Sequence, residues 1–364
     1  MCVFWIAVVF CVIITVWTVN RMDASIAEIN IIQSVPTQMK TSWFRVGPTY
    51  NQCHISLLPN LTNLRWPSPI VSKIATGKIK ANGGRERLPG MFEPAMSIGQ
   101  MELYRKLLHT FSEMMFRNGL GDRFMLTAGT LVGSFHHHDF IPWDDDIDIF
   151  VDTEIRDEVR QLVRELEPRY WLKVTNERDK FFTRPLPSPE DDENVELSQP
   201  VPDKPWSWPF VDIAYYERNK THITENLPAH VKSMSWPVDM VFPLYFRPFG
   251  SAWYPAPRNP LAFLANRYGT SSACYSLSYS HALERGMLSL SASCELLAYR
   301  YPFVQHGPCG KNAQAPDADM MSLSEEKLVI QSEIFSPAVI HSLCLAADAT
   351  NTRASPYDFG LKTR

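Results

Sequence analysis

The spacing of hydrophobic and polar positions changes several times along this chain, and each change predicts a different kind of structure. Residues 2–19 carry no charge and are apolar almost throughout, which is typical of a membrane-spanning helix. The next segment, to about residue 95, has poor periodicity and many turn formers, as in a linker. From Met101 onward apolar residues recur first at helical spacing and later in short β-prone runs, so we expect a globular domain there.

Within that domain, the apolar runs and the turn residues between them predict the order of elements. A helix that contains Tyr104 and Leu108 should end at Gly119. We expect strands at about 124–127, 147–151, 170–174, 180–183 and 210–216. We expect helices at about 130–135 and 153–166, and a hairpin followed by a helix within 242–269. Beyond about 285 the pattern degrades, and residues 286–364 are expected to form a tail without a clear element.

The N-terminal apolar run is either a cleaved signal peptide or an uncleaved signal anchor. As a helix, its residues would rise roughly 27 Å, close to the hydrocarbon thickness of a bilayer. The run lacks a basic segment before it and a clear small-x-small cleavage site, and it is longer than a usual signal core. We therefore predict a single-pass transmembrane signal anchor at residues 1–20, followed by a stem or linker at 21–95.

Composition and charge limit the kinds of molecule that the chain is expected to bind. The net charge is -4, and this mild acidity argues against nucleic acid, because binding to a phosphate backbone requires a basic surface. The cysteines outside the apolar run have no metal-type spacing, so we expect one or two disulfides with at least one thiol left over. These cysteines are Cys53, Cys274, Cys294, Cys309 and Cys344.

Two N-glycosylation sequons bear on the location of the domain. They begin at Asn60 and Asn219, and each by itself is weak because such triplets arise by chance. Orientation is weakly encoded, because Arg21 follows the apolar run and no basic residue precedes it. Together with the apolar run, the sequons favour a Golgi or ER membrane protein whose catalytic part is lumenal.

A cluster of acids marks the start of the strand expected at 147–151. The cluster consists of Asp144, Asp145, Asp146 and Asp148. Asp146 and Asp148 would face one side of a strand, because side chains alternate along it. Crowded carboxylates repel one another, and a divalent cation such as magnesium is the usual remedy. Asp212 has the right local pattern for a third ligand from a neighbouring strand. A solvated acidic turn is the alternative, which the apolar flanks make less favourable.

A small turn at Gly129 and Thr130 lies upstream of the acids. The helix that follows would direct its free backbone N–H groups towards this turn, where an anionic phosphate is stabilised. Thr130 can offer a hydroxyl and an N–H to a phosphate oxygen. We therefore take Gly129, Thr130 and Gly133 as candidate phosphate- or nucleotide-binding residues, with a purely structural turn as the alternative.

Three consecutive histidines follow, His136, His137 and His138. A zinc site is disfavoured, because consecutive side chains point in different directions and zinc ligands are usually spaced. We instead expect loop histidines of which one contacts substrate. His136 is the candidate catalytic residue, since a protonated imidazole can stabilise phosphate charge.

The segment GTLVGSFHHHDFIPWDDDIDIFV resembles the signature of the LicD family, which also contains fukutin and the fukutin-related protein. FVDIAYY and FPLYFRPFGSAWYPAPRNPLAFLANRYG resemble further parts of the family pattern, so the resemblance covers about residues 100–270. It implies an α+β fold of the nucleotidyltransferase type, a small mixed β-sheet flanked by helices with metal-binding acids on adjacent strands. We expect this domain to span residues 96–285.

The resemblance also implies a reaction. The family transfers a phosphorylated alcohol, such as phosphocholine or ribitol phosphate, from a CDP-linked donor to a glycan. Asp146 and Asp148 match the metal pair of the family, and Asp144 matches its preceding acid. We expect Mg²⁺ or Mn²⁺ held by Asp146, Asp148 and Asp212, with Asp144 or Asp148 accepting the proton of the attacking hydroxyl.

Gly129 and Thr130 match the phosphate turn of the family, whereas His136 departs from it. The family commonly has arginine at that position, and histidine cannot copy the bidentate grip of a guanidinium on phosphate. This departure and the atypical tail favour a second function, a non-catalytic relative that binds glycan or nucleotide and supports a partner glycosyltransferase. The intact acid set disfavours it. A nucleotidyltransferase that acts on nucleoside triphosphates is a third, weaker alternative.

Overall fold

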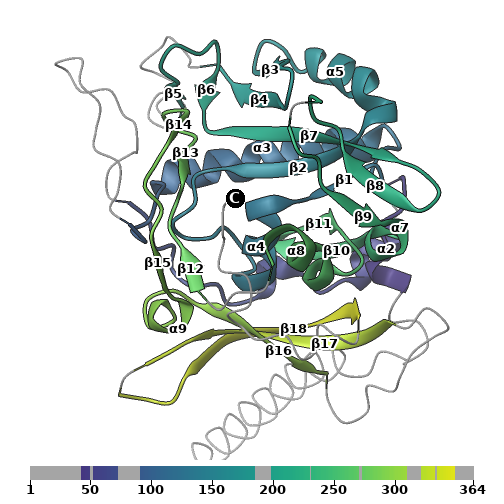
Figure 1. Cartoon of the computed structure of the whole chain (residues 1–364). Helices are drawn as coiled ribbons and strands as arrows, with labels where there is room; N and C mark the ends of the chain where they lie inside the picture. Colours follow the sequence, from purple (N-terminus) through teal and green to yellow (C-terminus); the bar gives the residue numbers. More distant parts are fainter. Residues whose placement is uncertain are drawn as a thin grey trace, which may run out of the picture. The chain divides into compact units, whose positions relative to one another are not determined.

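The computed structural model describes residues 42–49, 52–72, 91–184, 198–229, 231–269, 273–309, 321–332 and 334–348 (Figure 1). The chain divides into two units after Ser42, and the fold below is that of the second unit. The predicted signal anchor at 1–20 lies outside the described residues. Within the described ranges, every helix is too short or too polar to cross a bilayer.

A mixed seven-stranded sheet forms the centre of this unit. Its main path is β1 (Phe124–Leu126), β2 (Ile147–Asp152), β7 (Phe210–Arg218), β4 (Asp179–Thr183) and β3 (Tyr170–Lys173). The sheet continues from β7 through β8 (His222–Glu225) and β9 (Ser235–Pro237). β2 and β7 run parallel, and the other pairs are antiparallel. The predicted α+β architecture with a mixed sheet is therefore confirmed.

Helices cover this sheet where the periodicity of the sequence predicts them. The long helix α3 (Ile98–Arg117) starts at a capping box formed by Ser97 and Gln100 and buries Tyr104 and Phe111. The helices that follow in this part of the chain are α4 (Ala128–His136), η4 (Thr153–Ile155), α5 (Arg156–Arg164), α7 (Val238–Val241) and α8 (Pro260–Tyr268). Gly119 has a φ of +70° and ends the α3 region, as expected.

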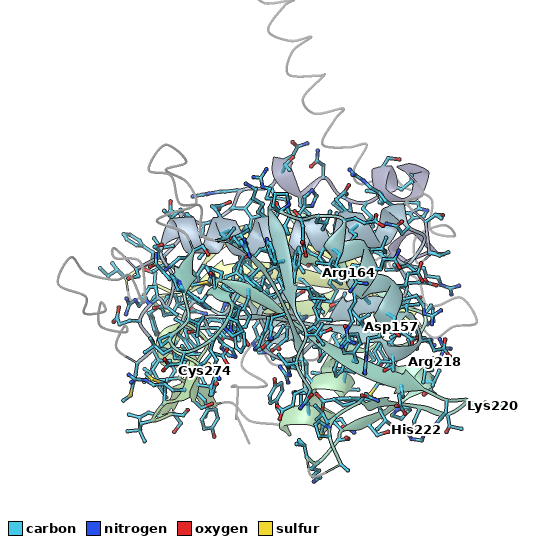
Figure 2. All side chains as sticks on the ribbon, turned by 90° about the horizontal axis from the view of Figure 1, so that it is seen from above. Asp157, Arg164, Arg218, Lys220, His222 and Cys274 are labelled. Atoms are coloured by element: carbon cyan, nitrogen blue, oxygen red, sulfur yellow. A yellow bond between two sulfur atoms is a disulfide. The ribbon has the colours of Figure 1, made fainter. Side chains whose placement is uncertain are left out.

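Short strands complete this layer. The hairpin of β10 (Tyr245–Phe249) and β11 (Ala252–Ala256) precedes α8, as the sequence predicts. β5 (Gln199–Pro200) pairs with β6 (Ser207–Trp208). Figure 2 shows Arg218, Lys220 and His222 of the β7–β8 turn at one edge of the domain, with Cys274 on the opposite side.

Part of the segment predicted as a stem belongs to the globular domain. It contains η2 (Ser42–Phe44), α2 (Gln52–Leu57) and η3 (Leu61–Asn63). Phe44 is buried, and backbone hydrogen bonds join Val46 to Leu244 and Gly121 to Pro48. The described residues 43–49 and 52–72 are therefore docked on the domain rather than free of it. Their short elements contain too few residues to produce a periodic pattern, which is why the sequence reads as a linker.

The region after residue 270 also forms strands, and those beyond residue 285 contradict the expectation of a tail without a clear element at 286–364. β12 (Ala273–Tyr275) pairs with β15 (Ser291–Ser293), and β13 (Tyr279–Ser280) pairs with β14 (Arg285–Gly286). After α9 (Cys294–Leu297), a three-stranded antiparallel sheet follows, made of β16 (Phe303–Pro308), β17 (Met321–Ile330) and β18 (Ala338–Asp348). Small and polar residues in these strands mask the alternation that would identify them.

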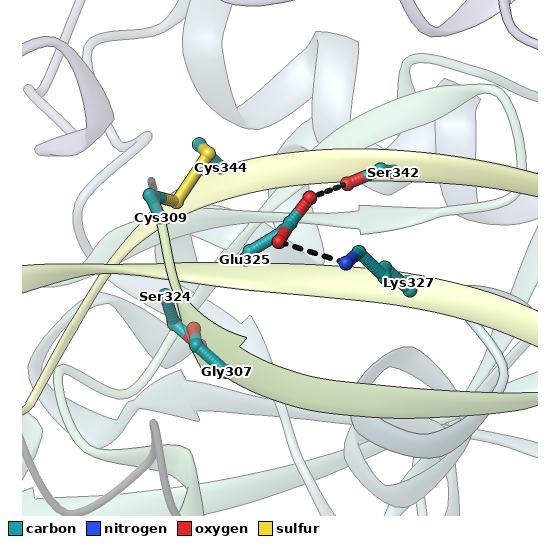
Figure 3. The surroundings of a disulfide bond; sticks show 7 residues. All are labelled: Gly307, Cys309, Ser324, Glu325, Lys327, Ser342 and Cys344. Carbon is teal, nitrogen blue, oxygen red and sulfur yellow. Dashed lines mark hydrogen bonds and ion pairs between the residues drawn. A yellow bond between two sulfur atoms is a disulfide. The ribbon is translucent and has the colours of Figure 1, made fainter. Parts of the chain in front are cut away.

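Two disulfides stabilise this C-terminal part. Cys274 is bonded to Cys294, and Cys309 is bonded to Cys344 (Figure 3). The second disulfide connects the chain just after β16 with the central part of β18. The prediction of one or two disulfides is thereby confirmed.

A buried polar network joins the C-terminal sheet to the rest of the domain. Glu326 of β17 is fully buried and receives two hydrogen bonds from Arg247 of β10, of 2.9 and 2.8 Å. Its Oε2 atom lies 2.9 Å from Nε2 of His138, whose Nδ1 lies 2.9 Å from Nε2 of His341 in β18. A carboxylate without solvent is tolerated here because a bidentate guanidinium neutralises it.

Candidate functional site

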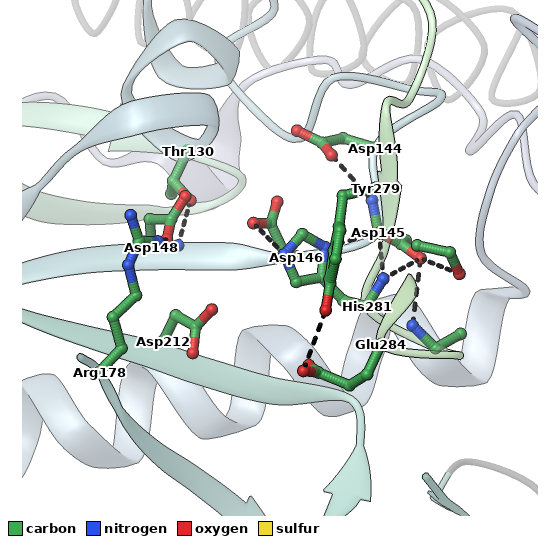
Figure 4. A network of polar contacts seen from close by, with 12 residues as sticks. Thr130, Asp144, Asp145, Asp146, Asp148, Arg178, Asp212, Tyr279, His281 and Glu284 are labelled. Carbon is green, nitrogen blue, oxygen red and sulfur yellow. Dashed lines mark hydrogen bonds and ion pairs between the residues drawn. The ribbon is translucent and has the colours of Figure 1, made fainter. Parts of the chain in front are cut away.

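Four buried acids converge where β2 begins. Asp144, Asp146, Asp148 and Asp212 expose 8%, 7%, 4% and 2% of their surface. The parallel register of β2 and β7 places Asp148 directly opposite Asp212. Figure 4 shows Asp146, Asp148 and Asp212 directed towards the same region. The fold therefore brings Asp148 and Asp212 together from two distant segments of the chain, as the sequence argument requires of these two acids.

Gly129 is fitted closely to these acids. A Cβ atom at this position would lie 2.7 Å from Oδ2 of Asp144 and 3.8 Å from Oδ1 of Asp146. No side chain can be added at such a distance without displacing the Asp144 carboxylate. Ala128 before it has a φ of +44°, so the chain turns sharply into α4 to reach this position. Glycine is therefore required where the turn meets the acid cluster.

Thr130 is tied to the same strand. Its hydroxyl oxygen accepts a hydrogen bond of 2.7 Å from the backbone N–H of Asp148. The hydroxyl proton can then be donated to another acceptor, such as a phosphate oxygen. Close packing of the backbone explains why position 133 is a glycine, because a Cβ there would lie 2.4 Å from the Asp139 carbonyl oxygen. Its predicted role in nucleotide binding stays a prediction.

Two basic side chains from the segment around β4 neutralise part of the cluster. Nζ of Lys180 lies 2.6 Å from Oδ1 of Asp212, and Nη1 of Arg178 lies 2.6 Å from Oδ1 of Asp148. Lys180 also lies 3.5 Å from Glu284 and faces the Phe210 ring at 4.3 Å. The first contact follows from register, since Lys180 and Asp212 are paired between β4 and β7.

Arg267 of α8 is a further basic residue near Arg178. The two are linked by Glu225 of β8, which is buried and lies 3.9 Å from Nη2 of Arg178 and 3.5 Å from Nη1 of Arg267. Both guanidinium groups are thus held by one carboxylate next to the acid cluster. A strip of positive charge beside carboxylates is the arrangement that a metal-bound diphosphate requires.

His281 enters the site from the β13–β14 hairpin. Its Nδ1 lies 2.9 Å from Oδ1 of Asp145, and its Nε2 lies 3.3 Å from Oδ2 of Asp146. The Asp145 carbonyl oxygen accepts hydrogen bonds of 2.7 Å from Tyr104 and from Trp208, which fixes this residue in the interior. Asp145 therefore holds His281 in place, while the histidine ring faces the acid cluster.

The crowding of the acids changes their proton affinity. Burial and the neighbouring Asp145 raise the pKa of Asp144 to about 7. Burial likewise raises the pKa of Asp146 well above its usual value, and Asp144 and Asp148 add to this effect. Burial opposes the charged form of His281, but Asp146 and Asp145 raise its pKa well above the ordinary value. The negative charge of the cluster thus exceeds what the nearby cations neutralise.

The donor set fits a hard divalent cation in its chemistry. Carboxylate oxygens are the ligands of Mg²⁺ and Mn²⁺, and the raised pKa values indicate negative charge that a cation would stabilise. Among the described residues, no three His, Cys, Asp or Glu side chains stand in metal-ligand geometry as they are. Lys180 lies 2.6 Å from one oxygen of Asp212, and Arg178 lies 2.6 Å from one oxygen of Asp148.

The structure places His136 at the end of α4, whereas His137 and His138 lie in the turn after it, as expected of loop histidines. His136 is 3% exposed and packs against the Phe303 ring of β16. His137 is hydrogen-bonded to the Pro302 carbonyl at 2.7 Å, and His138 belongs to the buried Glu326 network. All three side chains are therefore buried, in part under C-terminal strands that the sequence did not predict. The catalytic role of His136 stays a prediction.

A large groove lies elsewhere. It has a volume of about 1230 Å³ and is lined by residues such as Arg123, Asp152 and Tyr216, at the carboxyl ends of β2 and β7. Asn219 of the second sequon also lines it, and both sequon asparagines are exposed. None of the four clustered acids lines this groove. We assign the chemistry to the acid cluster, because four buried acids lie there next to Arg178 and Lys180.

Sequence reasoning missed the residues that complete the site. Arg178 lies in a turn between two expected strands, and only the strand register shows that Lys180 faces Asp212. His281 and Glu284 come from a segment with little pattern. The alternation of Lys180 with buried Phe181 offers a weak signal, since a charged residue is unusual in a covered strand.

A comparison with protein families places this site in a known context. Residues 121–259 match the family model described as LicD/FKTN/FKRP, nucleotidyltransferase domain. The matched span contains the four acids as well as Arg178 and Lys180, whereas His281 and Glu284 lie beyond it. No curated protein matches the chain.

Proposed function

Because the chain belongs to the LicD family through its nucleotidyltransferase domain at residues 121–259, we propose that it is a phosphotransferase of glycoconjugate synthesis. The transferred group is a phosphorylated alcohol of the phosphocholine or ribitol phosphate type. The donor is a CDP-activated form of that alcohol, and the acceptor is a hydroxyl of a glycan or glycoprotein. The observation that carries this proposal is the parallel pairing of β2 and β7, which sets Asp148 opposite Asp212.

Asp146, Asp148 and Asp212 would hold Mg²⁺ or Mn²⁺. The bound cation would neutralise the diphosphate of the donor and stabilise the charge of the leaving group. Arg178 and Lys180 stand next to the same carboxylates and are placed to bind donor phosphate oxygens. The Thr130 hydroxyl, whose oxygen already accepts from Asp148, donates its proton to another phosphate oxygen.

The bond changes follow the usual course of substitution at phosphorus. The acceptor oxygen forms a bond to the phosphorus that carries the alcohol, and the phosphoanhydride bond breaks. CMP leaves with the electron pair of that bond, and the hydroxyl proton passes to Asp144 or Asp148. These two acids lie at the edge of the cluster next to Gly129 and Thr130, respectively.

Two features support a lumenal location in the Golgi or ER. Both sequon asparagines are exposed, and four cysteines are paired in two disulfides, which persist in oxidising compartments. The predicted signal anchor at residues 1–20 would hold the domain at the membrane.

The test offers CDP-choline, CDP-ribitol and CDP-glycerol with a mixed glycan library to the purified chain, and identifies products by mass spectrometry. Asp146→Asn and Asp148→Asn should each abolish transfer while the thermal unfolding profile stays that of a folded protein. Asp157→Asn is the matched control, because Asp157 in α5 is 98% exposed and outside the site. Turnover retained by both site variants would refute the assignment of the metal ligands.

A second function, a non-catalytic relative that supports a partner glycosyltransferase, is favoured by one observation. His136, where the family commonly has arginine, is 3% exposed and packs against the Phe303 ring, and its imidazole cannot bind phosphate bidentately. A thermal-shift titration with CDP and Mg²⁺ separates the two functions, because only the enzyme should be stabilised by the combination. A panel of nucleoside triphosphates in the same titration tests the third alternative.

A further inference from the structure

The hairpin that carries His281 is fastened to the acid cluster by a single carboxylate. Asp145 accepts hydrogen bonds from the backbone N–H groups of His281 (3.2 and 3.1 Å) and Ala282 (3.3 Å), and from the Ser280 hydroxyl (3.4 Å). It also contacts Nδ1 of His281 at 2.9 Å. Asp145 is 1% exposed and lies between Asp144 and Asp146 in the chain. One acid of the cluster is therefore used entirely to place this histidine (Figure 4).

This anchoring fixes which ring nitrogen faces the site. With Asp145 as its partner, Nδ1 carries a proton and donates it to the carboxylate. Nε2 is then the atom presented to Asp146, at 3.3 Å from Oδ2. That separation is longer than the 2.7–2.9 Å, roughly, of a charge-assisted hydrogen bond. It does match the spacing of two adjacent ligands of one metal ion, about 3.0–3.4 Å when each is about 2.1 Å from the ion.

A histidine held by a carboxylate through one nitrogen is also the usual arrangement around protein-bound metals. The carboxylate fixes the tautomer and the ring orientation and increases the basicity of the ligating nitrogen. Asp145 and His281 have this relation, and the exposed fraction of the His281 side chain is only 16%. A solvated surface histidine would need no such support.

We propose that His281 supplies a nitrogen ligand to the metal site and thereby gives it a preference for Mn²⁺ over Mg²⁺. This inference rests on the proposed function, because it takes Asp146, Asp148 and Asp212 as the oxygen ligands. Imidazole nitrogen is a good ligand for transition metals, whereas Mg²⁺ strongly prefers oxygen. It also assigns a role to a residue outside the span matched by the family model.

The first test requires no substitution. The purified full chain is labelled with ¹⁵N-histidine, freed of metal and titrated with Mn²⁺ alone, and the nitrogen couplings of bound Mn²⁺ are measured by pulsed electron paramagnetic resonance. A directly bound imidazole gives a coupling that changes between ¹⁴N- and ¹⁵N-histidine protein. Absence of any histidine coupling in a protein that binds Mn²⁺ overturns the inference and leaves the proposed function intact.

The second test compares affinities for Mn²⁺ and Mg²⁺ by calorimetry. His281→Gln should weaken Mn²⁺ binding about 10- to 100-fold, as loss of a supporting or ligating group does at other metal sites. Mg²⁺ binding should change less than threefold, so the ratio of the two affinities should fall by about 3- to 100-fold. His222→Gln is the matched control, because His222 is exposed on β8 and far in sequence from the cluster. An unchanged ratio in His281→Gln contradicts the inference.

The outcome for the wild-type chain distinguishes this inference from the function on which it rests. Binding of neither Mn²⁺ nor Mg²⁺ by the intact protein would overturn both. A second outcome is that Asp148→Asn loses metal binding while His281→Gln keeps the wild-type ratio of Mn²⁺ to Mg²⁺ affinity. This outcome would support the proposed enzyme but would show that His281 is not a metal ligand. Asp145→Asn adds a positioning readout, since it should lower the ratio while leaving the imidazole in the protein.

Discussion

Replacing Glu326 by Gln should destabilise the fold far more than the same change at the adjacent Glu325. The two residues are neighbours in β17 and face opposite sides. Glu326 is fully buried and pairs with Arg247, which is 3% exposed, through hydrogen bonds of 2.9 and 2.8 Å. Glu325 lies on the outer face, where it contacts Lys327 at 3.1 Å and the Ser342 hydroxyl at 2.9 Å (Figure 3).

The expected magnitudes follow from what each substitution leaves behind. Glu326→Gln removes the counter-charge of a buried guanidinium, and breaking one partner of such a pair costs about 3–5 kcal/mol. It also disturbs His138, which lies 2.9 Å from Oε2 of Glu326. Glu325→Gln removes an exposed ion pair, worth about 0–1 kcal/mol, and keeps an acceptor for Ser342. The difference between the two variants should therefore be about 2–5 kcal/mol.

Urea unfolding of both variants measures this difference directly. For a domain of this size, each kcal/mol of unfolding free energy corresponds to a shift of the melting temperature of roughly 2–4 °C. Thermal unfolding should therefore rank the two variants in the same order of stability as urea unfolding does. Arg247→Met together with Glu326→Gln serves as a further control, because removal of both charges should restore part of the lost free energy. Equal destabilisation by Glu326→Gln and Glu325→Gln would show that the buried pair does not attach the C-terminal sheet.

Three more predictions follow from the geometry. Burial lowers the pKa of His137 from 6.5 to about 4, so its contribution to stability is complete above pH 6.5 and is lost as pH falls towards 4. Between pH 7 and 5 the wild type should therefore lose about 2 kcal/mol more unfolding free energy than His137→Gln, and parallel curves in denaturant titrations would refute this. Gly129→Ala should abolish transfer and weaken Mn²⁺ binding at least tenfold with the fold retained, because its Cβ would lie 2.7 Å from Oδ2 of Asp144; wild-type binding in calorimetry would contradict the fit. Replacing Cys309 and Cys344 by Ser should lower the unfolding free energy by about 4 kcal/mol, because their sequence separation is 35 residues, and an unchanged denaturation midpoint under non-reducing conditions would speak against a structural disulfide.

The strands of the central sheet can be predicted from the sequence, because they are either apolar throughout or show a clear alternation of apolar and polar residues. Ile147 to Val151 and Phe210 to Tyr216 are apolar runs with one acid each, so their strand character and the importance of their acids are visible without coordinates. Their parallel pairing is a non-local fact that no local pattern contains. The register that places Asp148 opposite Asp212 had to be inferred from the need to neutralise charge, and the fold agrees with that inference.

The C-terminal sheet escaped sequence analysis because its apolar and polar positions serve a buried network as well as a core. Glu326 and His341 stand at inward positions that are usually apolar, so the alternation in β17 and β18 is broken where the chain is most buried. The burial of the three histidines was not foreseen either, because nothing in the sequence predicted the strands that cover them. Long-range polar pairing, rather than local propensity, decides the structure of this part.

Under the proposed function, Lys180 and Arg178 connect metal binding to donor binding. Lys180 lies 2.6 Å from Asp212 and Arg178 lies 2.6 Å from Asp148, so each pairs with a carboxylate that is proposed to hold the metal ion. An ion on those carboxylates would compete with both side chains, which would then be available to bind phosphate oxygens. Metal and donor should therefore bind with positive coupling, because the cations that the ion displaces are the ones that the diphosphate needs.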